Sequence, residues 1–155
     1  MTRYAADTSV STEKSRMEIE QTLRRYKADA FAYATEAGRA TIGFRIAGRY
    51  VRFMLNLPDP GDREFTHHSR GLRTAEAAEK AWEQACRQRW RALALVIKAK
   101  LEAVAAGITT IEDEFLAHTM LPDGSTVGQW MKPQVDEAYR IGAMPTQLLI
   151  SGPAQ

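Results

Sequence analysis

The stretch that decides the fold runs from residue 30 to residue 58 and reads AFAYATEAGRATIGFRIAGRYVRFMLNLP. Within it, apolar side chains alternate with other residues in three runs, at residues 31–33, 42–46 and 51–57. The dipeptides Ala37-Gly38 and Ala47-Gly48 separate the runs, and glycine adopts the positive φ that a tight hairpin turn demands. Pro58 ends the third run. The pattern predicts a three-stranded antiparallel β-meander.

Helical periodicity appears on both sides of this meander. Ahead of it, Met17, Ile19 and Leu23 recur at helical spacing after several residues that favour the N-cap position, which predicts a helix over residues 12–26. Behind it, Thr74 is placed to cap a long helix that ends at Gly107. This helix carries an apolar stripe of Trp82, Cys86, Trp90, Leu93, Ile97, Leu101 and Val104.

Two shorter helices are expected after the long one. Thr110 precedes an acidic helix start, and Ser125 or Thr126 begins a last helix that Pro133 interrupts and that ends near Gly142. The expected fold class is therefore α+β: an N-terminal helix, a three-stranded antiparallel β-meander, a long basic amphipathic helix and two short C-terminal helices.

The length of 155 residues suits one domain. We expect a flexible N-terminal arm at residues 1–12, a single α+β domain at residues 13–145 and a C-terminal tail at residues 146–155. The segment from Pro58 to Arg73 is expected to be a basic loop, functional or mobile because structureless loops of this length are uncommon. No apolar run reaches the length of a membrane-spanning helix and no signal-peptide pattern begins the chain, so we expect a cytoplasmic protein.

Charge is distributed unevenly along the chain, although the net charge is only +2. Residues 1–38 carry equal numbers of basic and acidic side chains. Residues 39–101 carry thirteen basic and six acidic side chains, and residues 102–155 carry two basic and seven acidic ones. The middle third is therefore where an anionic partner would be attracted.

The basic residues of that middle third form the candidate binding site. Arg45 and Arg52 alternate with the apolar strand residues, so we expect them on the outer face of the sheet. Arginine pairs bidentately with phosphate oxygens, and a basic sheet face, a basic loop and a basic helix flank can together follow a phosphate backbone. The candidate nucleic-acid contacts are Arg45, Arg49, Arg52, Arg70, Arg73, Arg87, Arg91 and Lys98. A merely solvated surface is the competing interpretation.

Exposed aromatic side chains would add to such a site. Trp82, Trp90 and Trp130 lie in apolar stripes and are expected in the core. Tyr33, Tyr50 and Phe65 are expected to be exposed, on strands or in the loop, where they could stack on bases.

Signatures of common enzymes and metal sites are missing. The sequence contains no Walker A motif, dinucleotide-binding glycine motif, nucleophile elbow or zinc-type cysteine pair. The adjacent pair His67-His68 is read as solvated or phosphate-contacting, Glu112-Asp113-Glu114 as helix-start electrostatics, and Cys86 as a buried thiol. We therefore expect no catalytic residues, no metal and no cofactor.

Four motifs carry a family resemblance: EKSR at residues 13–16, RFMLNLP at 52–58, WEQACRQRWRAL at 82–93 and DGSTVGQWM at 123–131. With them the chain resembles a family of uncharacterised proteins that recurs in bacteriophages and prophages. The resemblance implies a phage setting in a bacterial host cell and no particular activity. A weaker likeness, in element order and charge alone, is to Rad52-type single-strand annealing proteins.

Three functions are compatible with these features. The first is a phage-encoded, non-enzymatic nucleic-acid-binding protein that favours single-stranded DNA, for annealing in replication or recombination. The second is a protein-binding inhibitor or adaptor that acts on a host or phage enzyme through the acidic C-terminal part or the long helix. The third is an enzyme with dispersed carboxylates such as Glu36, Asp59 and Glu114. Self-association into a homo-oligomer is also compatible with the sequence, through the long helix and the apolar tail.

Overall fold

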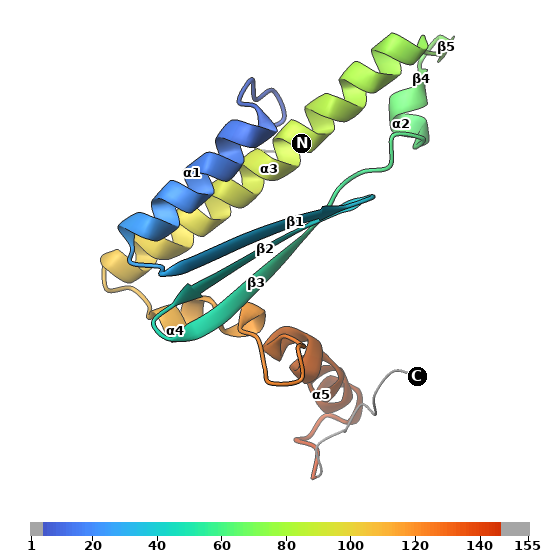
Figure 1. The fold of residues 1–155 in the computed structure, drawn as a ribbon. Helices are drawn as coiled ribbons and strands as arrows, with labels where there is room; N and C mark the ends of the chain where they lie inside the picture. Colours follow the sequence, from blue (N-terminus) through green and yellow to red (C-terminus); the bar gives the residue numbers. More distant parts are fainter. Residues whose placement is uncertain (1–4, 147–155) are drawn as a thin grey trace.

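The chain has an α+β fold, as predicted, in a computed structural model that describes residues 5–146. Its elements follow in the order α1 (Thr12–Arg25), β1 (Ala30–Glu36), β2 (Arg39–Ile46), β3 (Arg49–Asn56), α2 (Arg63–Thr66), β4 (His67–His68), β5 (Gly71–Leu72), α3 (Ala75–Ala105), α4 (Ile111–Glu114), η1 (Leu116–His118) and α5 (Val127–Ile141). In Figure 1, α1 and α3 lie side by side over one face of the sheet.

The predicted meander is confirmed, because β1, β2 and β3 form an antiparallel sheet in that order. The turn between β2 and β3 places both Ala47 and Gly48 at positive φ, 50° and 74°, which is the backbone geometry of a tight hairpin turn. Along β2, buried and half-exposed residues alternate strictly after Arg39. The sheet therefore has an inner face that builds the core and an outer face that does not.

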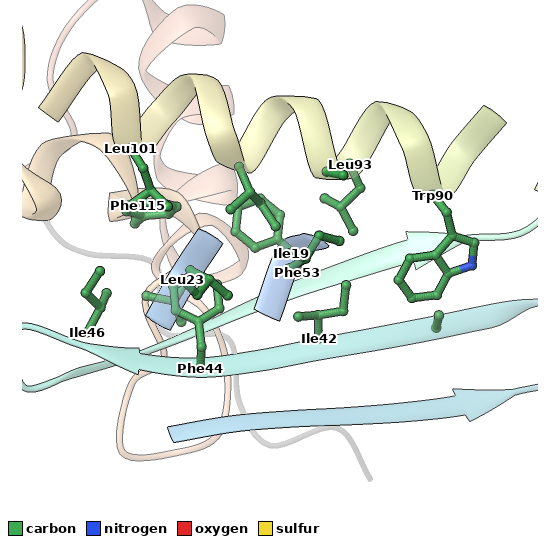
Figure 2. Close-up of a cluster of buried hydrophobic side chains, with 14 residues drawn as sticks. Ile19, Leu23, Ile42, Phe44, Ile46, Phe53, Trp90, Leu93, Leu101 and Phe115 are labelled. Atoms are coloured by element: carbon green, nitrogen blue, oxygen red, sulfur yellow. The ribbon is translucent and has the colours of Figure 1, made fainter. Parts of the chain in front are cut away.

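The core lies between the inner sheet face and the two long helices. Figure 2 shows Ile42 and Phe44 of β2 pointing toward Trp90 and Leu101 of α3. Ile19 and Leu23 of α1 are also almost fully buried in the same cluster. After α3, Phe115 closes this layer, with its ring edge-on to Phe44 and Phe53 at 5.6 and 6.2 Å between centroids.

The long helix is confirmed as a single unbroken α3 of 31 residues, about 46 Å at 1.5 Å per residue. Thr74 caps it, because its hydroxyl accepts a hydrogen bond from the Ala77 N–H at 3.2 Å. The amino-terminal part of α3 extends beyond the sheet and contacts α2, and the short strands β4 and β5 lie near its end (Figure 1). None of the helices in residues 5–146 is both long and apolar enough to cross a membrane.

Several expectations about individual segments are corrected. The Pro58–Arg73 segment is not structureless, because it contains α2, β4 and β5 and buries Phe65, which we expected to be exposed. Part of the expected arm contacts α3, because the Gln84 side-chain amide donates to the carbonyls of Ala6 and Thr8 at 3.0 and 2.9 Å.

The expected break at Pro133 is absent, because α5 runs through it from a complete capping box at Thr126 and Gln129 to a left-handed C-cap at Gly142. Proline removes one backbone donor from a helix, and the caps at both ends stabilise the remainder. Of the three tryptophans, Trp90 is buried, but Trp82 is only half-buried and Trp130 is 37% exposed. Of the expected tail at residues 146–155, all but residue 146 lies outside the described residues.

The C-terminal segment is attached to the open edge of β3. The Met120 N–H donates to the Tyr50 carbonyl at 2.8 Å, and Val51 forms a β-bridge with Thr119. Gly128 at the start of α5 lies so close to η1 that a Cβ atom there would stand 2.9 Å from the Ala117 carbonyl oxygen. Glycine is therefore needed where α5 meets η1.

Replacement of Ile97 by alanine tests the assigned core. Ile97 is fully buried in the cluster between α3 and the sheet. We expect Ile97→Ala to lower the free energy of unfolding by about 2–5 kcal/mol in urea titrations. The matched control is Ile108→Ala, because Ile108 is 79% exposed after α3 and its truncation should change stability by less than about 0.5 kcal/mol. Equal effects of the two substitutions would contradict the assigned core.

Candidate functional site

The outer face of the sheet, on the side opposite the core, carries mainly small side chains near its centre. Cross-strand pairing sets its residues in four rows: Ala30–Arg45–Tyr50, Ala32–Gly43–Arg52, Ala34–Thr41–Met54 and Glu36–Arg39–Asn56. Five of these residues, Ala30, Ala32, Ala34, Thr41 and Gly43, are small, so the floor of this face consists of alanine, glycine and threonine. Tyr50 and Met54 on β3 are exposed by 55% and 42%. We call these twelve residues the outer sheet face.

Arg45 is fixed in place on this face. Its Nε and Nη2 atoms donate to the two carboxylate oxygens of Asp29 at 2.7 and 2.9 Å, and its Nη1 donates to the Tyr50 hydroxyl at 3.1 Å. The hydrogen bond with Arg45 lowers the pKa of Asp29, and the same contact, followed by that with Tyr50, raises the pKa of Arg45. Since a guanidinium has five N–H donors, two of them remain for another acceptor.

Two further arginines occupy the outer sheet face. Arg52 donates from Nη2 to the Gln129 side chain of α5 at 3.2 Å, and the same Gln129 oxygen accepts the Thr126 N–H of the capping box. Arg39, which we had not included among the candidate contacts, pairs with Glu36 at 2.7 Å. The face therefore presents three positioned guanidinium groups, two of which have a carboxylate partner.

The eight candidate contacts do not form one surface. Only Arg45 and Arg52 lie on the outer sheet face. Arg49 is exposed at the turn that starts β3, and its register partner is Ile46, so it belongs to the inner side of the sheet. Arg87, Arg91 and Lys98 lie on α3, which covers the inner face (Figure 1). Arg70 and Arg73 lie beside the small hairpin of β4 and β5.

Three of the six remaining candidates already serve the fold. Arg73 donates to the carbonyls of Glu64 and Phe65 at 3.1 and 3.0 Å and so caps α2. Arg87 makes two hydrogen bonds with Gln84, and Arg91 pairs with Glu18 of α1. Arg49, Arg70 and Lys98 are exposed, and within residues 5–146 no side-chain hydrogen bond or ion pair holds them.

The carboxylates considered for an enzyme are separated. Glu36 pairs with Arg39, Asp59 accepts the Gly61 N–H at 2.7 Å, and Glu114 pairs with Lys100 at 3.0 Å. In the described part of the chain, no three His, Cys, Asp or Glu side chains are grouped as metal ligands. Cys86 is buried, and desolvation raises the pKa of its thiol, which disfavours the reactive thiolate.

A second exposed surface lies on the last helix. Tyr139 and Met144 are exposed by 86% and 83%, and together with Ala138, Gly142 and Ala143 they line a shallow apolar hollow at the end of α5. Trp130, Val135 and Ile141 of the same helix are also partly exposed. Exposed apolar groups of this kind are typical of surfaces that contact other proteins.

Two features of the outer sheet face were missed from the sequence. Asp29 and Gln129 orient its arginines from outside the sheet, and no local pattern relates Gln129 to a residue 77 positions away. The smooth floor could have been found, because Ala30, Ala32 and Ala34 alternate with larger residues at the period of a strand.

No protein-family model, curated protein or solved structure matches this chain. The fold and the two surfaces are therefore described from the structure of this chain alone.

His118 lies under the sheet where the C-terminal segment joins it. Its ring stacks on Phe53 with 4.0 Å between centroids and an angle of 20°. Desolvation, and then the charge of Lys100, lower the pKa of His118 from its ordinary 6.5, while a hydrogen bond with the Arg52 backbone acts in the opposite direction. The folded state therefore favours the neutral imidazole.

This pKa shift predicts a dependence of stability on pH. The unfolded chain takes up a proton at His118 near pH 6.5, before the folded chain does. The free energy of unfolding should therefore decrease as pH falls below that value, down to the lower folded pKa, and His118→Gln should remove this part of the decrease. An NMR titration of the His118 ring gives the folded pKa directly, and a midpoint at or above 6.5 would contradict the assigned environment.

Proposed function

We propose that this chain is a phage-encoded, non-enzymatic nucleic-acid-binding protein that favours single-stranded DNA and acts in replication or recombination in the host cytoplasm. The outer sheet face is its binding surface. The observation that supports this is the combination of a smooth floor, an exposed Tyr50 and a positioned arginine in three of the four rows. The setting rests on the resemblance of four sequence motifs to phage and prophage proteins.

The physical argument starts from what each group offers to a strand. The floor of alanine, glycine and threonine lets a base approach the sheet, Tyr50 is exposed for stacking, and Met54 offers an exposed apolar contact. The remaining donors of Arg45, and the Nη donors of Arg52 that Gln129 does not take, can bind phosphate oxygens, whereas Arg52 Nε is buried. Because Asp29 and Gln129 already orient these groups, binding costs little side-chain freedom.

The same geometry favours single strands over duplex. In a duplex the faces of the bases are stacked on one another, whereas a single strand can place them on an exposed aromatic ring. The contacts available are stacking and phosphate pairing, which are tolerant of sequence.

Binding of fluorescent single- and double-stranded oligonucleotides, followed by anisotropy at two salt concentrations, tests the proposal. We expect affinity for single strands that decreases with salt. Arg45→Ala with Arg52→Ala should flatten the slope of log K against log salt by about 0.7 for each phosphate that the variant no longer neutralises, and Tyr50→Ala should cost about 1–3 kcal/mol.

Two further variants separate this surface from a general charge effect. Gly43→Val adds a side chain to the floor with only the Val51 carbonyl nearby, at 3.8 Å, so it should keep the fold and weaken binding. Lys98→Ala removes an exposed charge from α3 on the other side of the sheet and should leave binding nearly unchanged. Unchanged affinity of Gly43→Val, or no binding by the wild type at low salt, would contradict the proposal.

The second candidate function, an inhibitor or adaptor that binds a host or phage enzyme, is favoured by the exposed apolar residues of α5. Under this proposal, capture from bacterial lysate should recover a stoichiometric protein partner. Tyr139→Ser with Met144→Ser should abolish the capture, while Ile108→Ser, which changes an equally exposed apolar residue after α3, should not. Equal capture by all three proteins would contradict a role for α5.

A further inference from the structure

The two edges of the sheet differ in how they are covered. The edge of β3 is bridged at Val51 by Thr119 and accepts the Met120 N–H at Tyr50. The edge of β1 extends over seven residues, and within residues 5–146 β1 pairs with no strand other than β2. Figure 1 shows β1 as the outermost strand on this side.

The direction of the backbone groups on β1 follows from its hairpin with β2. A two-residue turn at Ala37-Gly38 closes on the pair Glu36 and Arg39, and hydrogen-bonded pairs alternate along an antiparallel ladder. The even-numbered residues of β1 therefore direct their N–H and C=O groups to β2. Phe31, Tyr33 and Thr35 direct theirs away from the sheet, as three donors and three acceptors in a row.

This edge lacks the features by which proteins block strand addition. Natural edges carry lysine, proline, a bulge or an inward charge, or are very short. β1 reads AFAYATE, and its one charged residue, Glu36, is at the end and paired with Arg39. The register with β2 is continuous over all seven residues.

We propose that a second copy of this chain adds to this edge, with the two β1 strands antiparallel about a two-fold axis at Tyr33. This register joins every outward N–H of residues 31–35 to an outward C=O of the other copy. The pairs across the axis are Tyr33 with Tyr33, Phe31 with Thr35, Ala32 with Ala34 and Ala30 with Glu36. No two like charges face each other directly.

The side chains on the inner side fit this pairing. A cavity of about 160 Å³ opens at this edge between α1 and the start of β1, and Leu23, Ala28 and Phe31 line part of it. In the proposed register, Thr35 of the second copy stands beside Phe31 on the same face, next to this cavity, while its hydroxyl donates to the Tyr33 hydroxyl of its own copy at 2.6 Å. Symmetry repeats the contact on the other copy.

The centre of the interface is also defined. Tyr33 is 37% exposed, its ring lies 5.6 Å from that of Trp90, and the Arg16 guanidinium stands 4.4 Å above it. Pairing about Tyr33 covers both tyrosine rings. The two Arg16 groups come near each other at the solvent boundary, where salt screens their repulsion. Association should therefore be stronger at moderate than at very low salt, opposite to nucleic-acid binding.

Pairing in this register has a consequence for the outer face. Two rows become continuous through the axis, each reading Arg52, Gly43 and Ala32 from one copy, then Ala34, Thr41 and Met54 from the other. The result is a six-stranded sheet with a floor of small residues, bounded by one Arg52 on each side. This inference rests on the open edge of β1 and does not require the proposed binding of nucleic acid.

Sedimentation equilibrium without nucleic acid, across a wide range of protein concentration, tests the dimer. We expect a reversible monomer–dimer equilibrium for the wild type. Thr35→Pro removes an outward N–H and leaves the ladder with β2 complete, so it should give a monomer with unchanged circular dichroism. Thr35→Val keeps both the N–H and the branched shape and should still dimerise. A wild-type monomer at every concentration would overturn the proposal.

Disulfide cross-linking tests the register and does not depend on the proline variant. In a Cys86→Ala background, Ala32→Cys with Ala34→Cys places cysteines at a directly opposed pair, whose expected Cα separation of about 4.5 Å permits a disulfide. Oxidation should give a covalent dimer. Ala30→Cys with Ala32→Cys places no two cysteines opposite each other and should remain largely monomeric. Equal cross-linking of the two variants, or none in either, would contradict the register.

Discussion

The one-sided burial of the three-stranded sheet is the constraint on which the rest of the structure depends. Side chains alternate along a strand, so Ile42 and Phe44 enter the core between the sheet and the α1–α3 pair while Gly43 and Arg45 are directed to the other side. Burial of the inner residues stabilises the domain, and a shift by one residue would place all of them in water. The outer sheet face is thus a direct result of how the core is built.

Charge alone is a poor guide to the use of that face. The middle third of the chain is strongly basic, but much of its charge is engaged within the fold: Arg91 pairs with Glu18, Arg73 caps α2 and Arg45 binds Asp29. Such contacts orient the guanidinium groups and reduce their net field. The outer sheet face is therefore better described by its shape and its positioned donors than by an excess of positive charge. Specific contacts, and not long-range attraction, would determine what binds there.

Local signals in the sequence predicted the elements well. The glycine turns, the period of two through residues 42–57 and the caps at Thr74 and Thr126 are all confirmed, because each depends on neighbouring residues. The tertiary placement of side chains was not predictable in this way. Arg45 and Lys98 lie on opposite sides of the sheet, Phe65 is buried by α2 packing on α3, and α5 continues through Pro133 because of its caps. These outcomes depend on contacts between residues that are distant in the sequence.

An NMR titration of the labelled protein with a short single-stranded oligonucleotide tests the central claim most directly, because it reports on every backbone amide at once. The account predicts that the largest shift changes fall on Gly43, Arg45, Tyr50 and Arg52, while the amides of α3 around Lys98 stay unchanged. Changes concentrated on α3 or at the end of α5, or no change at low salt, would contradict the assignment of the outer sheet face as the binding surface.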